Sequence, residues 1–277
     1  MMVRRLIVHI VLLIILGGML FPFAWMISTS LKSGPEAERN NRFLPTQVHT
    51  ENYPSAWVGA RRIAPPHTFG RFFLNSLGVA LCVTGFVLMT SLLAGYAFAC
   101  LQFPGRQVIF LLFMATMMVP FEVTIIPNFL TIRTLHLYNS YAALVVPWIA
   151  NVFSIFLVRQ FMMGIPRDYF DAARIDGCTH FQFLFQIAAP MAAPALATVA
   201  LFAFLGSWNS FLWPLLVIDD PSKYVVQYGL ALYVQEESNS FNLLMAASAM
   251  VIAPVVVLYL LAQRYFVEGV SAVGIKG

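Results

Sequence analysis

The chain has 277 residues, of which 60% are hydrophobic and only 10% are charged, and its formal net charge is +4. A soluble domain carries roughly 25% charged residues, and a protein of this size could not solvate its surface with so few. The composition therefore excludes a soluble globular enzyme. It predicts an all-α integral membrane protein, because lipid cannot satisfy the backbone groups of open strands.

The first apolar run covers residues 6–31 and follows two arginines, as a secretory signal would. A signal peptide, however, has an apolar region of about 7–15 residues that ends in small residues. This run is longer, and Phe21, Pro22 and Trp25 stand where cleavage would need small side chains. We interpret the run as a retained transmembrane helix, and a cleaved signal peptide is the alternative.

Five more apolar runs follow along the chain. A transmembrane helix needs about 20 predominantly apolar residues. The runs that satisfy this requirement are at residues 72–101, 108–132, 141–161, 192–218 and 243–266. The sequence thus predicts six spanning helices, with both ends of the chain on the same side of the membrane.

The distribution of basic residues does not decide the orientation. If the N-terminus is cytoplasmic, eight Lys and Arg residues lie inside and eight lie outside. Six of the outside residues belong to one long loop at residues 32–71, and such a loop is only weakly controlled by charge. The shorter loops alone favour a cytoplasmic N-terminus by eight to two.

Patterns of catalytic and metal-binding residues are lacking in the sequence. The three cysteines and five histidines are scattered, and no C-x-x-C or H-E-x-x-H spacing occurs. The tail at residues 269–277 carries G-x-x-x-x-G but neither the Lys-Ser/Thr nor the preceding strand of a phosphate loop. We therefore predict no catalytic residue, no metal site and no bound cofactor in this chain, and an intramembrane enzyme is the least favoured function.

Glu122 is the one clearly intramembrane ionisable residue, just past the centre of the third run. A lone carboxylate at mid-helix costs about 2.5–3.5 kcal/mol on insertion scales, so its side chain should face protein or water. It is either a proton-coupling group or a hydrogen-bonded structural group beside Pro120. An ion-coupled secondary transporter that uses Glu122 is therefore one candidate function.

Polar side chains within the apolar runs suggest a path for a solute. Asn151 lies midway along the fourth run with Trp148 and Ser154 three residues away on either side, so the three should share a helix face. An aromatic ring beside an amide suits a sugar or polyol, whose apolar faces stack and whose hydroxyls need hydrogen bonds. Packing between helices is the alternative. The candidate path residues are Asn75, Glu122, Asn151, Trp208 and Asn209.

The stretch "DAARIDGCTHFQFLFQIAAP", residues 171–190, separates two of the apolar runs. Pro166 suits the start of a helix, Asp168 and Asp171 fall where the helix dipole favours acids, and Gly177 can end the helix in the left-handed conformation. The helix is too short and polar to span. It should lie across the membrane surface, either docked in a cleft of another protein or as a simple connector.

This stretch resembles a family signature. Asp171-Ala-Ala-Arg-Ile-Asp-Gly177, nine further residues and Ile187-Ala-Ala-Pro190 resemble the "EAA–G–I-LP" signature of permease subunits of bacterial binding-protein-dependent ABC importers. The stretches "MMVPFEVTIIPNF", "SWNSFLWPLLV" and "FVEGVSAVGIKG" resemble, more narrowly, the MalG-type subunit of carbohydrate importers. The signature's Glu is replaced by Asp171, which shortens the reach of that carboxylate, and its Leu is replaced by Ala189.

The resemblance implies the type I ABC importer permease fold, with six transmembrane helices, in the inner membrane of a bacterium. It makes the 171–177 helix a cytoplasmic coupling helix seated on a dimer of ATPase subunits that bind ATP and Mg, and this settles both termini as cytoplasmic. The implied coupling residues are Asp171, Ala172, Ala173, Arg174, Ile175, Asp176 and Gly177. The implied tail contacts with the ATPase are Gly274, Ile275 and Lys276.

The resemblance also implies two further partners. A second, homologous permease subunit would complete the pore, and an external solute-binding protein would touch residues 32–71 and 219–241. The solute would be a carbohydrate or polyol, with glycerol 3-phosphate as one alternative. The expected organisation is a first span at residues 1–31, an external loop at 32–71, a core at 72–266 that includes the coupling loop 162–190, and a tail at 267–277.

Overall fold

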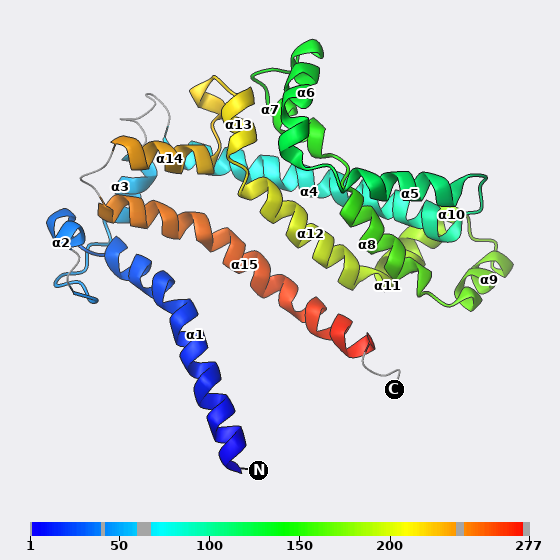
Figure 1. Ribbon diagram of the computed structural model, residues 1–277, viewed down its shortest axis with the longest axis horizontal. Helices are drawn as coiled ribbons and strands as arrows, with labels where there is room; N and C mark the ends of the chain where they lie inside the picture. The colour runs from blue at the N-terminus through cyan, green and yellow to red at the C-terminus, as the bar shows by residue number, and fades with distance from the viewer. Residues whose placement is uncertain (1, 40–41, 60–67, 237–240, 274–277) are drawn as a thin grey trace. The chain divides into compact units, whose positions relative to one another are not determined.

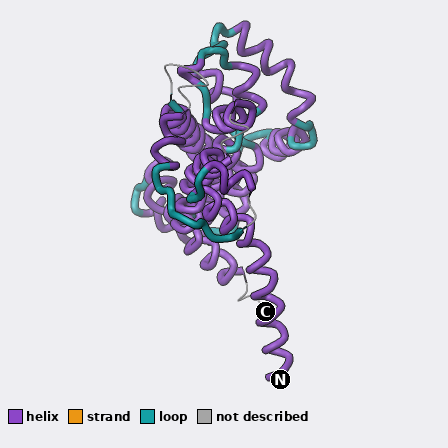
Figure 2. The backbone as a smooth tube through the Cα atoms, turned by 90° about the vertical axis from the view of Figure 1, so that its left-hand side faces the viewer, coloured by secondary structure: helices purple, strands orange, loops and turns teal. Residues whose placement is uncertain are grey.

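The computed structural model describes the chain apart from residues 1, 40–41, 60–67, 237–240 and 274–277. The described residues form helices joined by turns and loops, and no β-strand occurs among them (Figures 1 and 2). The chain separates into two compact units. One contains Met1–Phe73 and Tyr228–Pro254, and the other contains Leu74–Gln227 and Val255–Gly277.

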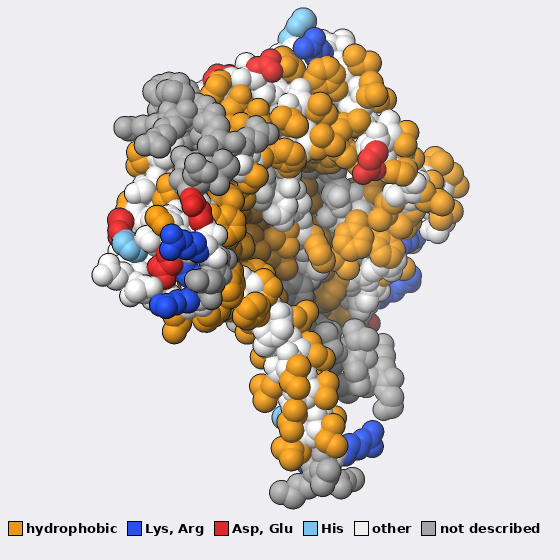
Figure 3. All heavy atoms as spheres, turned by 60° about the vertical axis from the view of Figure 1, so that its left-hand side comes forward, with side chains coloured by type: hydrophobic (Ala, Val, Ile, Leu, Met, Phe, Trp, Pro, Cys, Tyr) orange, Lys and Arg blue, Asp and Glu red, His pale blue; other side chains and the backbone are white. Residues whose placement is uncertain are grey.

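The first unit is built from α1 (Met2–Ser30), α2 (Gly34–Arg39), α3 (Asn52–Gly59) and parts of α4 (Phe69–Cys100), α14 (Val226–Glu236) and α15 (Phe241–Val273). Side chains at residues 4–24 of α1 are exposed, and hydrophobic ones cover this helix (Figure 3). The last turn of α1 is buried, where the Asn52 side-chain amide donates to the carbonyl oxygens of Ser30 and Lys32, each at 2.8 Å.

The second unit contains the remaining helices and the greater part of α4. These helices are α5 (Arg106–Thr116), α6 (Phe121–Thr134), α7 (Tyr141–Val145), η1 (Val146–Trp148), α8 (Val152–Met163), α9 (Arg167–Ile175), α10 (His180–Phe183), the π-helical η2 (Leu184–Ala188), α11 (Ala189–Met191), α12 (Ala193–Trp208), α13 (Leu212–Val217) and η3 (Pro221–Lys223). Close packing holds α4 against α8, since a Cβ added at Gly95 would lie 2.7 Å from the Val158 side chain.

Three described helices are long and apolar enough to cross a membrane by themselves: Arg4–Ser30, Phe69–Cys100 and Phe241–Gln263. Three bent pairs bring the number of candidate spans to six if each pair is one crossing. The pairs are Arg106–Thr116 with Phe121–Thr134, Tyr141–Trp148 with Val152–Met163, and His180–Met191 with Ala193–Trp208, bent by 100°, 43° and 81°. The prediction of six spans agrees with the structure when each bent pair is one crossing, and half of the spans are then broken helices.

The break in the third predicted span comes from Pro120. Its backbone is extended, with φ −61° and ψ 145°, and α6 begins at the next residue. A residue that precedes proline is pushed out of the helical conformation, so α5 ends before this point. Glu122 therefore lies in the first turn of α6 and not at the middle of a continuous helix, as the sequence had suggested.

The break in the fourth predicted span comes from Asn151. Its backbone is extended, with φ −132° and ψ 120°, and its side-chain oxygen accepts the Ser154 N–H at 2.9 Å. Asparagine is a favoured N-cap, so this residue starts a new helix within the apolar run. The prediction that Trp148, Asn151 and Ser154 share one face of a continuous helix is wrong for this reason.

The fifth predicted span also differs from the structure. A continuous helix at residues 192–218 was expected, but α12 ends at Trp208 and α13 begins at Leu212. The bent pair that includes α12 instead extends backwards through α10, η2 and α11. Prolines at 190 and 194 flank the bend, and proline removes a backbone donor and clashes with the preceding turn.

Candidate solute pathway and coupling helix

A cavity of about 640 Å³ lies within the second unit. Its wall is formed by parts of α4, α6, α8, α12 and α13, and many of its residues stand at helix breaks. The lining residues at or beside the breaks are Phe121, Glu122, Trp148, Asn151, Ser207 and Ser210. Irregular backbone at membrane depth is tolerated where it lines a water-filled space. The cavity therefore accounts for the presence of helix breaks inside the apolar runs.

Aromatic rings form one side of this cavity. The Trp148 ring centroid lies 5.2 Å from that of Phe121 and 6.3 Å from that of Trp213, with the two indoles perpendicular. The indole N–H of Trp213 donates to the Ala143 carbonyl oxygen at 2.9 Å, which fixes that ring in place. Edge-to-face packing of this kind gives a rigid apolar surface on which the face of a sugar ring can stack.

Polar groups on the same wall keep some of their hydrogen-bonding capacity. The Asn151 side-chain oxygen accepts the N–H and the hydroxyl of Ser154, at 2.9 and 3.0 Å. This leaves the Asn151 NH2 group without a partner among the described residues. The Glu122 side chain is exposed, and no described residue forms a hydrogen bond or an ion pair with it. The cavity therefore offers both donors and acceptors to a bound molecule.

The other three candidate path residues lie outside the cavity wall. Trp208 is buried and stacks on Phe204, with ring centroids 5.6 Å apart. Asn209 is exposed, and its side-chain oxygen accepts from the Gln227 amide at 3.3 Å. The structure thus brings Glu122 and Asn151 together in the wall of one cavity. Trp208 and Asn209 do not line this cavity.

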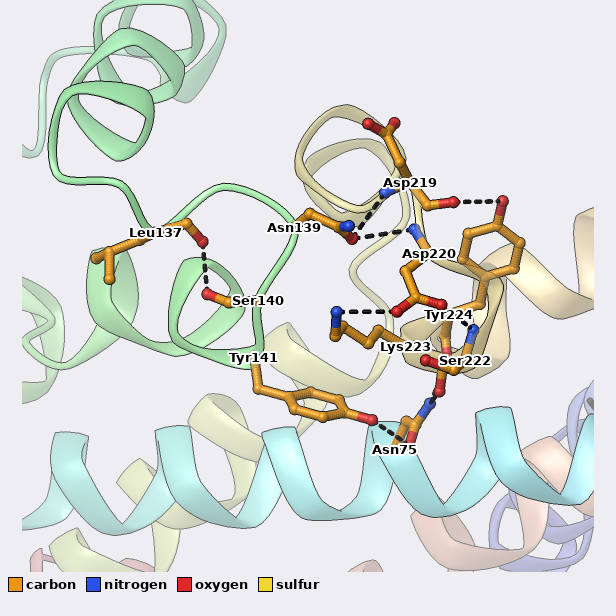
Figure 4. Close-up of polar contacts among 10 residues, drawn as sticks. All are labelled: Asn75, Leu137, Asn139, Ser140, Tyr141, Asp219, Asp220, Ser222, Lys223 and Tyr224. Carbon is orange, nitrogen blue, oxygen red and sulfur yellow. Dashed lines mark hydrogen bonds and ion pairs between the residues drawn. The ribbon is translucent and has the colours of Figure 1, made fainter.

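Asn75, the third of these residues, fastens a loop to α4 (Figure 4). Its amide donates to the carbonyl oxygens of Ser222 and Tyr224, both at 2.9 Å, and its oxygen accepts from the Tyr141 hydroxyl at 2.9 Å. All of its partners belong to the second unit. Its side chain is therefore committed to holding the segment at residues 219–224, here named the 219–224 loop.

Asn139 holds the same loop from the other side (Figure 4). Its backbone is left-handed, with φ 56°, and its side-chain oxygen accepts the N–H groups of Asp219 and Asp220 at 3.2 and 3.0 Å. Asp220 in turn accepts from the Lys223 ammonium and the Ser222 N–H, each at 2.9 Å. These hydrogen bonds, led by that of Lys223, lower the pKa of Asp220 well below its usual value. Every member of this network has a partner.

Several lining residues were not singled out from the sequence. Phe121 and Trp213 complete the aromatic wall, Ser207 lies in the last turn of α12, and Ser210 lies in the gap between α12 and α13. A strong helix-breaking or capping residue inside an apolar run is the signal that could have marked such positions, as Pro120 does for Phe121. Pro120 and Asn151 are the two such residues whose effect is now evident.

The short helix α9 carries the stretch that resembles the coupling signature. It ends at Ile175, and Gly177 has φ 75°, which confirms the predicted left-handed end. The apolar side chains of α9 differ in exposure, because Ala173 is 5% exposed and packs against its own chain whereas Ile175 is 86% exposed. Ala172 and the charged side chains of the stretch are also exposed. A partner would thus meet Ala172 and Ile175 but not Ala173.

Aromatic rings tie α9 to the rest of the second unit. The Phe170 ring centroid lies 4.0 Å from that of Phe183 and 6.4 Å from that of Tyr96 in α4. The Tyr96 hydroxyl also shares a 2.8 Å hydrogen bond with the His180 ring. Phe170 in α9 thus contacts both α4 and α10. The predicted tail contacts Gly274, Ile275 and Lys276 lie outside the described residues.

The sequence of this chain is similar to those of known proteins, and this similarity identifies its family. The model of the family described as "Binding-protein-dependent transport system inner membrane component" matches residues 77–272. The chain belongs to this family. It is 35% identical over 261 residues to the arabinooligosaccharides transport system permease protein AraQ of Bacillus subtilis, covering 93% of this chain and 91% of the relative. It is 33% identical over 265 residues to the sn-glycerol-3-phosphate transport system permease protein UgpE of Yersinia pestis, covering 94% of each.

Solved structures agree on the fold. A bacterial ABC transporter involved in the import of the acidic polysaccharide alginate superposes with a TM-score of 0.82, at 24% identity, over 95% of this chain and 96% of the other. The same kind of transporter in complex with an alginate pentasaccharide-bound periplasmic protein gives a TM-score of 0.61, at 14% identity, over 94% and 93%. The predicted all-α, type I importer permease fold is confirmed.

Membership of this family resolves the choice between transport mechanisms. The relatives are subunits of binding-protein-dependent transport systems in the inner membrane, so an ABC importer permease is favoured over the ion-coupled transporter that would use Glu122. The relatives are named as transport permeases, which agrees with the transport subunit that the sequence predicts.

Proposed function

We propose that this chain forms half of the pore of an ATP-driven importer for a carbohydrate or polyol-type solute. The single observation that carries the proposal is the family match together with the similarity to AraQ along almost the whole chain. The cavity suits such a solute, because aromatic faces stand beside groups that donate and accept hydrogen bonds. A second, homologous permease subunit would supply the other half of the pore.

Within this proposal, α9 is the coupling helix. Its residues Asp171–Gly177 would lie on the cytoplasmic side, against a dimer of ATPase subunits that bind ATP and Mg, and both chain termini would be cytoplasmic. Support comes from the exposed Ile175 and from the sharp left-handed turn at Gly177, which sets the direction of the next segment. The Phe170 ring contacts would carry movement of α9 into α4. The tail residues Gly274, Ile275 and Lys276 are proposed as a further ATPase contact.

The solute path would run through the cavity, with Glu122 and Asn151 in contact with the solute. Asn75, Trp208 and Asn209 would act around it, Asn75 by holding the 219–224 loop and Trp208 by packing. Residues 32–71 and 219–241, which include that loop, would face an external solute-binding protein. The relatives' names include both arabinooligosaccharides and sn-glycerol 3-phosphate, so uncharged and anionic solutes both occur among related systems.

The test is reconstitution of the complete importer in proteoliposomes. Its solute is first identified by mass spectrometry of the co-purified solute-binding protein. Uptake of that solute should require hydrolysable ATP and should survive dissipation of the proton and sodium gradients. Uptake that continues without ATP, or that collapses with either gradient, would contradict the importer mechanism.

Gly177 gives a sharper test of the coupling helix. Valine at this position resists a positive φ, at a cost of about 1–2 kcal/mol, whereas asparagine tolerates it. A Cβ at Gly177 meets no atom within 4 Å, so the effect reports the backbone and not a clash. Gly177→Val should abolish solute-stimulated ATP hydrolysis or release the ATPase, and Gly177→Asn should retain most of both. Wild-type coupling in Gly177→Val would make α9 a mere connector.

A further inference from the structure

The cavity wall carries negative charge without a positive counterpart among the described residues. Among the described lining residues, Glu122 is the one ionisable side chain, and no Lys, Arg or His lines the cavity. The remaining polar side chains of the wall are neutral serines and the amide of Asn151. A single negative charge thus faces a small space that is otherwise apolar or uncharged.

Three described basic residues of the second unit are engaged away from this wall. The Arg159 guanidinium lies 4.0 Å from the Phe110 ring centroid and donates to the Phe98 carbonyl oxygen. The Arg133 guanidinium lies 4.5 Å from the ring centroid of Tyr138. Lys223 is paired with Asp220. None of these cations is placed to neutralise Glu122.

The position of Glu122 favours a carboxylate that acts on the cavity and not on the fold. It stands in the first turn of α6, where the exposed N–H groups of the helix stabilise negative charge. It has no hydrogen-bond or salt-bridge partner among the described residues, and its side chain is exposed. A structural carboxylate would be paired or hydrogen-bonded, as Asp220 is in the 219–224 loop.

We propose that the Glu122 carboxylate makes this cavity a barrier to anionic solutes, so that the importer carries uncharged sugars or polyols. The proposal rests on the proposed function and narrows its substrate class. In a space walled by aromatic rings, repulsion between like charges is far less screened than in bulk water. An uncharged sugar meets no such repulsion, and its hydroxyls can donate to the carboxylate while the Asn151 NH2 donates to them.

The barrier can be measured without knowing the solute, by the charge preference of a thiol placed in the cavity. Ser210 lines the cavity, and Ser210→Cys is nearly isosteric. In a background where Cys82, Cys100 and Cys178 are replaced by alanine, the complete reconstituted importer is treated with two methanethiosulfonates of similar size. One reagent carries a trimethylammonium group and the other a sulfonate. The ratio of their modification rates, corrected for their ratio on a free thiol, reports the sign of the local potential.

With Glu122 present, the cationic reagent should be preferred, and Glu122→Gln should reduce the ratio about tenfold or more. Glu122→Asp keeps the charge and should keep the preference. The matched control is Asp168→Asn, which removes an exposed carboxylate of α9 that does not line the cavity and should leave the ratio unchanged. If the ratio is the same with Glu122, with Glu122→Gln and with Glu122→Asp, the barrier does not exist.

Two further outcomes keep this inference separate from the proposed function. An anionic solute on the co-purified binding protein would overturn the charge barrier while leaving the ATP-driven importer intact. Stimulation of ATP hydrolysis by the binding protein, measured on the same Ser210→Cys preparation, tests the importer alone. Charge preference at the thiol with no such stimulation would contradict the importer function and not the electrostatics of the cavity.

Discussion

The cavity wall and the 219–224 loop both place polar side chains in a mostly apolar protein, but they treat them differently. In and around the loop, Asn139, Asp220 and Asn75 direct their polar atoms to partners of the same chain. On the cavity wall, Glu122 and the NH2 group of Asn151 have no partner among the described residues. A buried polar group without a partner is costly, so groups left open are kept where water or a solute reaches them. The contrast separates scaffold from pathway.

The largest effect that tests this contrast is expected at Asn139, on the scaffold side. Asn139→Leu loses two hydrogen bonds to the backbone of Asp219 and Asp220 and puts an unsuitable side chain at φ 56°. The loss should reach about 2–4 kcal/mol, measured as a lower midpoint of thermal unfolding of the purified importer. Asn139→Gly keeps the backbone conformation and should lose only the hydrogen-bond part. Equal stability of both variants and the wild type would mean that the loop is not held by Asn139.

A smaller effect on stability is expected at Asn151, which belongs to both the scaffold and the pathway. Its oxygen caps α8, and its side chain is part of the cavity wall. Asn151→Leu should destabilise by about 1 kcal/mol through the lost cap and should also reduce uptake. Asn151→Asp keeps the cap but removes the donor, so it should fold normally and still reduce uptake. Normal uptake in Asn151→Asp would place the NH2 group outside the path.

The smallest effect on stability is expected at Glu122, on the pathway side. Because its carboxylate has no described partner, Glu122→Gln should change the free energy of unfolding by less than about 1 kcal/mol, the size of a helix-dipole contribution. ATP-dependent uptake should largely persist, since the amide still accepts hydrogen bonds. A change in stability as large as that of Asn139→Leu would show that Glu122 is part of the scaffold after all.

The apolar runs were sufficient to predict the class of the fold. Six runs separated by polar segments correspond to three long helices and three bent pairs, and the helix that ends before Gly177 was predicted together with its left-handed turn. These features depend on local sequence, namely on apolar length and on glycine, the residue type that most readily adopts a positive φ.

The breaks were not predicted, because hydropathy does not register them. In the sequence, an asparagine that binds a solute cannot be distinguished from one that caps a helix. The Asn151 oxygen caps α8 by accepting the N–H of Ser154, three residues further along the chain. Asn75 shows the same limit over a longer range, since its partners lie 66 to 149 residues away along the chain. Sequence therefore identified the polar residues of the apolar runs, and only the fold could divide them into pathway and scaffold.

The length of the exposed helix α1 determines how this helix must adapt to the thickness of the membrane. The apolar part Arg4–Ser30 has 27 residues. At 1.5 Å per residue such a helix is about 40 Å long, whereas the hydrocarbon layer is about 30 Å thick. The excess must be taken up by tilt or by an end that reaches the headgroups. Since the last turn is already fastened to Asn52 through Ser30, that end belongs at the interface. A thinner bilayer would therefore change the tilt of α1 before it disturbed this attachment.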